Sequence, residues 1–282
     1  NTRLWDDTHN AEKSQGWCPA VMDVNGDGKI GAYTMAPEPV DAALDRAVPP
    51  GAYGVAYNPV DGSVWYSTVG SPGRLVRIVR GANPPETCVA EFYEPPFDNP
   101  KLPGVRASHT RGIDVDTNGV VWTPLADEGD LASFDRRKCK VLTGVAATTG
   151  QHCPEGWTLY PVPGPVYKTA PNVKVDYNYY MWIDRFDVLG LGKNVPVIDG
   201  AMSDSLVAFQ PDTKQFTRMT VPYPMGFFSR FFDGRIDDPG AGWKGRGVWA
   251  ANQTRGSQLT EGGRNTPSQL AHFQIRPDPL AK

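Results

Sequence analysis

The chain has 282 residues, enough for one large domain or two, and its 28 basic and 31 acidic residues give a net charge of −3. No run of like charge stands out and no stretch approaches roughly 18 consecutive apolar residues, so neither a nucleic-acid-binding face nor a membrane-spanning helix is predicted. Its 30 glycines and 27 prolines, together with many aromatic residues, are typical of an all-β protein with short strands and many turns.

The first motif along the chain is DVNGDGKIGAYT, at residues 23–34. It has the alternating oxygen donors of a calcium loop, with Gly28 at the sharp turn. Thr34 stands where a helix-borne glutamate would chelate, so a regulatory EF-hand is not predicted. A structural calcium site and a turn in which the same side chains accept backbone hydrogen bonds both remain open. The donors are Asp23, Asn25, Asp27 and the backbone carbonyl of Lys29.

Four cysteines are scattered along the chain, and none belongs to a CxxC or CxxCH motif that would hold zinc or haem. An even number in a turn-rich chain predicts two disulfides and an oxidising compartment, and the alternative is four reduced thiols in the cytosol. Cys139 and Cys153 are predicted to pair, because a short loop with a Thr/Gly turn separates them. The pair Cys18–Cys88 then follows by elimination.

A repeat fills the chain from residue 51 onward. Residues 53–78 and 111–134 each contain a Gly-led strand, an Asx/Gly turn, a Val-Trp strand and a Leu-containing strand. The last two elements recur twice more, and we place each tryptophan on the second strand of a repeat and each leucine on the third. The tryptophans are Trp65, Trp122, Trp182 and Trp249, and the leucines are Leu75, Leu131, Leu206 and Leu270.

Repeated antiparallel meanders are typical of the blades of a β-propeller, because each twisted sheet buries its faces against its neighbours. Four blades are visible in residues 51–282, and residues 1–50, which contain the calcium-type loop, are candidates for part of a preceding blade. Since rings of six or seven blades are commoner than rings of four, we expect the C-terminal part of such a ring. A β-sandwich is the alternative, but it would not require the fourfold recurrence.

In a propeller, the loops that enter the innermost strands converge at one end of the channel. If the Gly-led strand is innermost, Tyr53, Asp233 and Arg235 are predicted to contact a ligand there. A base at His109, a metal ligand or acid at Glu261 and an anion clamp at Arg111 or Arg235 would suit lactone-opening or hydrolytic chemistry. The structural alternative is that the histidine and the arginines tie neighbouring loops together. The aromatic residues at 176–182 are a further candidate platform for a ligand.

Several segments resemble the virginiamycin B (streptogramin) lyase-like propellers of bacteria, in particular exported members that carry an N-terminal carboxypeptidase-regulatory-like domain. The resemblance covers roughly residues 50–282 and implies a seven-bladed propeller. Lyases of that family open a cyclic depsipeptide lactone with a magnesium ion, a histidine base and a glutamate near the central channel. The segments that carry the resemblance are RGIDVDTNGVVW, TGQHCPEGWTLYPVPGP, VPYPMGFFSRFFDGRIDDPGAGWKGRGVWA and FQIRPDPLAK.

Two functions remain open for a periplasmic or secreted propeller of this kind. One is the binding of a small molecule or of a protein partner in a periplasmic complex, with calcium as a structural ion. The other is a metal-dependent lyase or hydrolase, with magnesium, that opens a small ester or lactone at the channel mouth. We prefer binding, because the sequence contains no unambiguous catalytic set.

Overall fold

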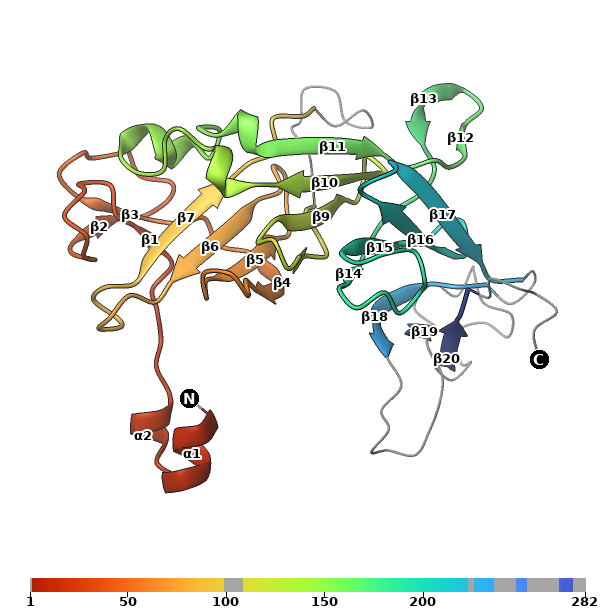
Figure 1. Cartoon of the computed structure of the whole chain (residues 1–282). Helices are drawn as coiled ribbons and strands as arrows, with labels where there is room; N and C mark the ends of the chain where they lie inside the picture. The colour runs from red at the N-terminus through yellow and green to blue at the C-terminus, as the bar shows by residue number, and fades with distance from the viewer. Residues whose placement is uncertain (1, 99–108, 223–225, 236–246, 253–268, 276–282) are drawn as a thin grey trace.

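The computed structural model describes residues 2–98, 109–222, 226–235, 247–252 and 269–275. From residue 52 onward, four antiparallel sheets follow one another along the chain, and within each sheet the strands are paired in chain order (Figure 1). The first sheet contains β4 (Ala52–Tyr57), β5 (Val64–Thr68), β6 (Leu75–Val79) and β7 (Val89–Tyr93). The second contains β8 (Asp114–Val115), β9 (Val121–Leu125), β10 (Asp130–Phe134) and β11 (Trp157–Pro161).

The third sheet contains β14 (Met181–Asp184), β15 (Val195–Gly200), β16 (Ser205–Gln210) and β17 (Gln215–Thr220). The described part of the fourth contains β18 (Ser229–Arg235), β19 (Gly247–Asn252) and β20 (Gln269–Phe273). A short hairpin of β12 (Val166–Tyr167) and β13 (Ala170–Lys174) lies between the second and third sheets in the chain. Two α-helices, α1 (Thr2–Thr8) and α2 (Ala11–Ser14), lie apart from the sheets (Figure 1), and no helix among the described residues is long and apolar enough to cross a membrane.

The first strands of the four sheets lie next to one another in the order β4, β8, β14, β18. The sheets therefore stack face to face, and a hydrophobic core fills each of the three spaces between them. A strand with apolar residues on both faces is stable only when both faces are covered, which explains why β9 and β15 are buried along their whole length. This stacking in series agrees with the predicted repeat and not with a two-sheet sandwich.

Tryptophans and phenylalanines pack between the sheets, as the repeat predicts, but one of them was assigned to the wrong strand. Trp65 on β5 and Trp122 on β9 are almost fully buried, each among other aromatic rings. Trp182, in contrast, lies on β14, the first strand of its sheet, and not on the second strand. The true second strand, β15, has the sequence VPVIDG and contains no tryptophan. Trp249 lies on the second strand of its sheet, as predicted, and is 42% exposed.

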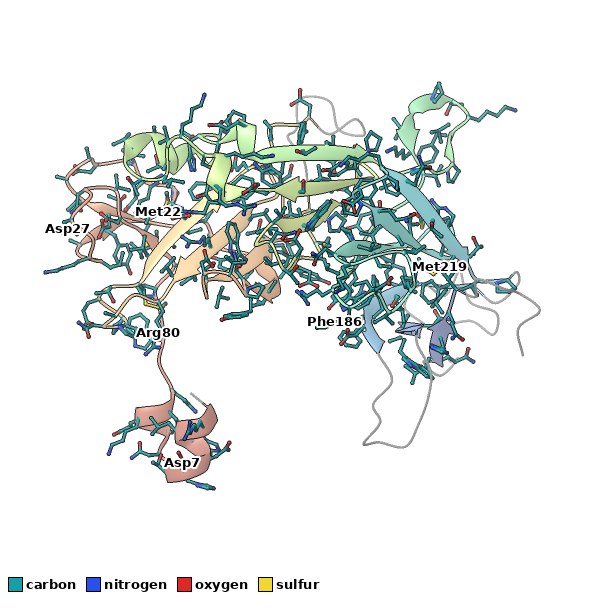
Figure 2. The ribbon with its side chains drawn as sticks, in the orientation of Figure 1. Asp7, Met22, Asp27, Arg80, Phe186 and Met219 are labelled. Carbon is teal, nitrogen blue, oxygen red and sulfur yellow. A yellow bond between two sulfur atoms is a disulfide. The ribbon has the colours of Figure 1, made fainter. Side chains whose placement is uncertain are left out.

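The N-terminal segment covers the other face of the first sheet. It contains β1 (Val21–Met22), β2 (Tyr33–Thr34) and β3 (Asp45–Ala47), and β1 packs against β7. Met22 and Val48 share a core with Phe92 of the first sheet, and Figure 2 labels Met22 in this position. The segment therefore supplies the apolar cover that this end of the row of sheets requires.

Both predicted cysteine pairs are disulfide-bonded. Cys18–Cys88, with Cα atoms 5.5 Å apart, joins the N-terminal segment to the residue before β7. Cys139–Cys153, with Cα atoms 5.0 Å apart, closes the connection between β10 and β11. Cys139 lies just after η1 (Arg136–Lys138), which follows β10, the third strand of its sheet.

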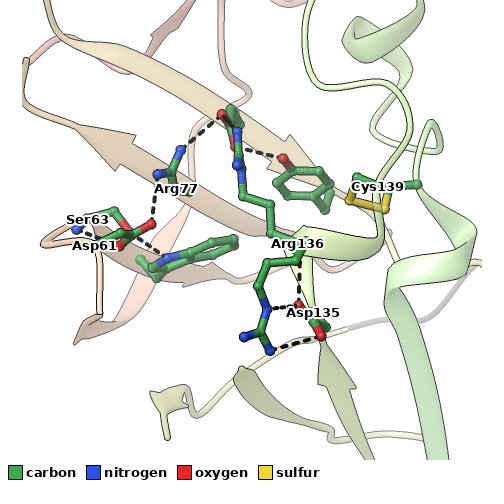
Figure 3. Close-up of polar contacts among 11 residues, drawn as sticks. Asp61, Ser63, Arg77, Asp135, Arg136 and Cys139 are labelled. Carbon is green, nitrogen blue, oxygen red and sulfur yellow. Dashed lines mark hydrogen bonds and ion pairs between the residues drawn. A yellow bond between two sulfur atoms is a disulfide. The ribbon is translucent and has the colours of Figure 1, made fainter. Parts of the chain in front are cut away.

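A buried ion-pair network joins the first and second sheets (Figure 3). Arg136 lies on the 3-10 turn η1 (Arg136–Lys138) that follows β10, and it donates two hydrogen bonds of 2.5 Å to the carboxylate of Glu91 on β7. Arg77 on β6 also pairs with Glu91, at 3.0 Å, and the hydroxyl of Tyr93 donates to it at 2.7 Å. Glu91 is only 5% exposed, so these partners must satisfy its charge.

Candidate functional site

Side chains from all four sheets meet where the first strands begin. Tyr53 lies on β4, Arg111 precedes β8, two tyrosines precede β14, and an arginine at the start of β18 follows a phenylalanine. We name this group the Tyr–Arg cluster. Its members are Tyr53, Arg111, Tyr177, Tyr179, Phe228 and Arg230.

Tyr179 is the centre of the cluster. Its hydroxyl accepts a hydrogen bond of 2.5 Å from Tyr53, and its ring contacts those of Tyr53 and Phe228 edge-on, with centroids 5.7 Å apart in both cases. The backbone N–H of Tyr179 donates at 2.5 Å to the fully buried carboxylate of Asp199 on β15. The backbone at the central tyrosine is thus held by the second strand of its sheet.

Two guanidinium groups flank the Tyr179 ring. The guanidinium carbon of Arg111 lies 5.0 Å from the centre of the Tyr179 ring and 5.0 Å from that of Tyr53. The guanidinium carbon of Arg230 lies 4.7 Å from Tyr179 and 5.5 Å from Phe228. These are cation–π distances, so the aromatic rings hold both positive charges in place.

Neither of these arginines has a carboxylate partner among the described residues. The Nε of Arg111 donates to the neutral hydroxyl of Tyr177 at 3.2 Å, and the Nε of Arg230 is buried without any hydrogen-bond partner. Arg46, elsewhere in the chain, donates to the carbonyl of Ala36. The other partly buried arginines with described side chains all pair with acids: Arg74 with Glu94, Arg77 and Arg136 with Glu91, Arg185 with Asp114, and Arg218 with Asp176.

The tyrosines do not balance this positive charge. Burial raises the pKa of Tyr53, as do its hydrogen bond and its electrostatic interaction with Tyr179. The charges of Arg111 and Arg230 act in the opposite direction. Burial likewise raises the pKa of Tyr177, against the effect of its hydrogen bond with Arg111. Both phenols are therefore neutral at pH 7, and the two guanidinium charges remain.

His109 lies two residues before Arg111, on the same connection into β8. Its Nδ1 lies 2.6 Å from the carboxylate of Asp127, and its backbone has the left-handed φ of 58°. The backbone of the same residue donates to Gly70 and accepts from Ala126. His109 consequently has both an oriented imidazole, as a base would need, and the loop-tying contacts of the structural alternative.

The other predicted site residues lie apart from the cluster or outside the described residues. Asp233 is exposed on β18, opposite Trp249, and it is one of the charges near Tyr180. Arg235 ends β18, and its side chain lies outside the described residues, as does all of Glu261. The structure therefore brings Tyr53 and Arg111 together, with His109 beside Arg111 in the chain, and it leaves Asp233 out.

Four members of the Tyr–Arg cluster were not among the predicted ligand-binding or catalytic residues. Tyr177 and Tyr179 belong to the aromatic stretch 176–182, which we had considered only as a general platform. Phe228 and Arg230 belong to the sequence FFSRFF at 227–232, where alternation of aromatic residues with a cation was the available signal.

The calcium-type loop lies at the outer edge of the N-terminal segment, where Figure 2 labels Asp27. Its side chains accept backbone hydrogen bonds within the loop, as the turn alternative predicts. Among the described residues, no group of three or more His, Cys, Asp or Glu side chains could hold a metal. The predicted calcium donors include only two such side chains, Asp23 and Asp27, so this finding does not test them. The bonds join Gly26 and Gly28 to Asp23 at 2.7 and 2.9 Å, Asp27 to Asn25 at 3.1 Å, and Lys29 to Asp27 at 2.8 Å.

No family model matches the chain, and no curated protein matches its sequence. Solved structures do match: virginiamycin B lyase from Staphylococcus aureus has 13% identity and a TM-score of 0.39, over 81% of this chain and 71% of the lyase. Apo AztD from Citrobacter koseri has 14% identity and a TM-score of 0.39, over 76% and 45% of the two chains. The WD40 repeats of RRP9 have 8% identity and a TM-score of 0.41, over 81% and 52%. The first of these three is a structure of a virginiamycin B lyase, from the propeller family named in the sequence analysis.

Proposed function

We propose that the chain is part of an exported β-propeller of six or seven blades, and that it binds a small ligand at the Tyr–Arg cluster. The observation that carries this proposal is the convergence of side chains from the starts of four successive first strands. Loops and strand ends that converge in this way are the usual place for ligand sites on propellers and other β-folds, because each sheet contributes one group.

The chemistry of the cluster favours binding over catalysis. It consists of aromatic rings and guanidinium groups, and it contains no nucleophile with an adjacent base. Its phenols Tyr53 and Tyr177 have raised pKa values, so neither supplies a base at neutral pH. Rigid aromatic rings with few rotatable bonds bind a ligand with little loss of conformational entropy.

The two disulfides support an oxidising location, the periplasm or the exterior of the cell. In such a location a small molecule is the ligand that we propose, and a protein partner in a periplasmic complex is the alternative occupant. We also propose calcium as a structural ion in the loop at residues 23–29, where it would stabilise the N-terminal segment and take no part in ligand binding.

A ligand screen with two matched variants tests the binding proposal. Purified protein would be screened against small metabolites by ligand-observed NMR, and each hit repeated with Tyr53→Leu and Tyr57→Leu. Both tyrosines lie on β4 and both are exposed, at 38% and 61%, but only Tyr53 belongs to the cluster. We expect hits that lose binding in the first variant and keep it in the second. Hits that are indifferent to Tyr53, or no hits at all, would contradict the proposal.

A second candidate, a magnesium-dependent lyase or hydrolase acting on a small ester or lactone, is favoured by one observation. The 2.6 Å contact between His109 and Asp127 would orient an imidazole as a general base, with Arg111 nearby to stabilise a developing anion. The test is the opening of small lactones, with and without magnesium, by the wild-type protein and by His109→Gln. Activity that His109→Gln retains in full would eliminate this candidate.

A further inference from the structure

We infer that the ligand of the Tyr–Arg cluster is an organic carboxylate, whose charged group pairs with Arg111 and Arg230 while its apolar part contacts the neighbouring rings. This inference rests on the proposed function, since it names the chemical class of ligand for the same site. A planar carboxylate matches the planar fork of N–H donors on a guanidinium group, which explains the choice of acid.

The first support is uncompensated charge. Two guanidinium carbons lie within 5.0 Å of the centre of one ring, that of Tyr179. Burial keeps the pKa of Tyr53 raised in spite of both arginines, so this phenol does not act as their counterion. The nearby carboxylate of Asp127 is paired with His109, whose Nδ1 lies 2.6 Å from it. Because the cluster is partly buried, solvent screens its positive charge less than it would at the open surface.

The second support is the contrast with the rest of the described chain. Where this protein partly buries an arginine elsewhere, an acid or a backbone carbonyl of the chain itself accepts its hydrogen bonds. A buried donor without a partner is costly, and the Nε of Arg230 is such a donor. An external anion would supply these two arginines with the negative charge that no described acid of the chain supplies.

The third support is the arrangement of the rings. Stacking of a guanidinium over an aromatic face leaves its N–H groups directed outward around the edge of its plane. Arg111 is held in this way by Tyr53 and Tyr179, and Arg230 by Tyr179 and Phe228. Tyr53 is 38% exposed, so an apolar surface lies beside the charges and is accessible to solvent. The site is therefore prepared for a molecule with an acid at one end and a flat or apolar body.

Paired probes that differ only in charge test the inference. Benzoate and glucuronate would be titrated by NMR or calorimetry beside their neutral counterparts benzamide and glucose, and beside inorganic sulfate and phosphate. We expect at least one of the two carboxylates to bind about tenfold or more tightly than its neutral counterpart. Arg111→Gln and Arg230→Gln should each weaken that binding about tenfold, whereas Arg80→Gln, which removes an exposed arginine, should not.

Other outcomes separate this inference from the binding proposal beneath it. Equal binding of benzoate and benzamide, lost in Tyr53→Leu, would overturn the carboxylate and leave the ligand site intact. Sulfate or phosphate binding as tightly as the organic acids would also overturn it, in favour of a bare anion site. If neither carboxylate binds, the inference fails, and if the broader screen also yields no Tyr53-dependent ligand, the binding proposal fails with it. Unchanged thermal unfolding of Arg111→Gln and Arg230→Gln confirms that lost binding does not reflect lost structure.

Discussion

Replacing Arg136 should destabilise the protein far more than replacing its neighbour Arg137, although both lie on η1 and both form ion pairs. Arg136 donates two hydrogen bonds to Glu91, whose side chain is 7% exposed, and this contact joins the first sheet to the second. Arg137 pairs with Asp135 on the surface, and its own side chain is 65% exposed. The substitutions Arg136→Gln and Arg137→Gln therefore remove the same charge from two different environments.

The expected magnitudes follow from the partners that remain. Without Arg136, Glu91 keeps Arg77 and the Tyr93 hydroxyl but loses its bidentate partner, so we expect Arg136→Gln to lower the free energy of unfolding by about 2–3 kcal/mol. Arg137→Gln should cost less than about 1 kcal/mol, because exposed pairs are screened by water and salt. Urea unfolding followed by tryptophan fluorescence measures both. Equal losses in the two variants would refute the view that the Glu91 network holds the first two sheets together.

Three further outcomes are expected. Both ring nitrogens of His152 are buried without hydrogen bonds, and burial lowers the pKa of His152 although the charges of Glu91 and Glu155 act in the opposite direction. Since an unfolded histidine titrates near about pH 6.5, the free energy of unfolding should fall as the pH drops below that value. His152→Leu should flatten this part of the profile when unfolding is measured as a function of pH. Calcium should raise the unfolding temperature relative to chelator, a difference that Asp23→Ala removes; no calcium effect would leave only the turn. The double variant Cys139→Ser/Cys153→Ser, which opens a loop with a sequence separation of 14, should lose about 3 kcal/mol in urea unfolding, and an unchanged midpoint would contradict this.

The features that the sequence predicted correctly depend on local chemistry. An Asx/Gly turn ends β4 and another ends β8, and turn residues act within a few positions of themselves. The pair Cys139–Cys153 is similarly local, since a short connection brings its two ends together. Register within a meander then follows from the turns, which explains why the row of antiparallel sheets was predictable.

The errors concern residues whose role depends on packing between sheets. Trp182 packs between the third and fourth sheets from a first strand. Trp65, between the first and second sheets, and Trp122, between the second and third, pack from second strands. A tryptophan satisfies the need for volume from either position, so spacing alone could not distinguish the strands. Trp182 and Leu206 are 24 positions apart, which leaves room for β15, but Trp249 and Leu270 are 21 positions apart with Trp249 on a second strand, so a long separation does not by itself indicate an additional strand.

The candidate site was only half predictable for a related reason. Tyr53 and Arg111 were identified because each stands beside the glycine of a Gly-led strand. Arg230 lies at the start of β18 with no glycine beside it, and it approaches Tyr179 only because β14 and β18 lie side by side. Contacts between residues so far apart in sequence depend on the stacking of whole sheets, which no local pattern specifies.

A ligand-binding role for Arg230 has a consequence for stability that a structural role does not have. The fold leaves its Nε buried without a partner, which costs free energy, while its contacts with Tyr179 and Phe228 return part of that cost. Arg230→Met keeps an unbranched apolar stem beside both rings and removes the unpaired donor and the charge. Because loss of the cation–π contact and relief of the buried donor are each worth about 1 kcal/mol and have opposite signs, we expect the free energy of unfolding to stay within about 1 kcal/mol of the wild-type value. A loss as large as that expected for Arg136→Gln would mean that Arg230 mainly holds the sheets together, whereas unchanged stability with lost carboxylate binding is the result expected of a residue retained for a ligand.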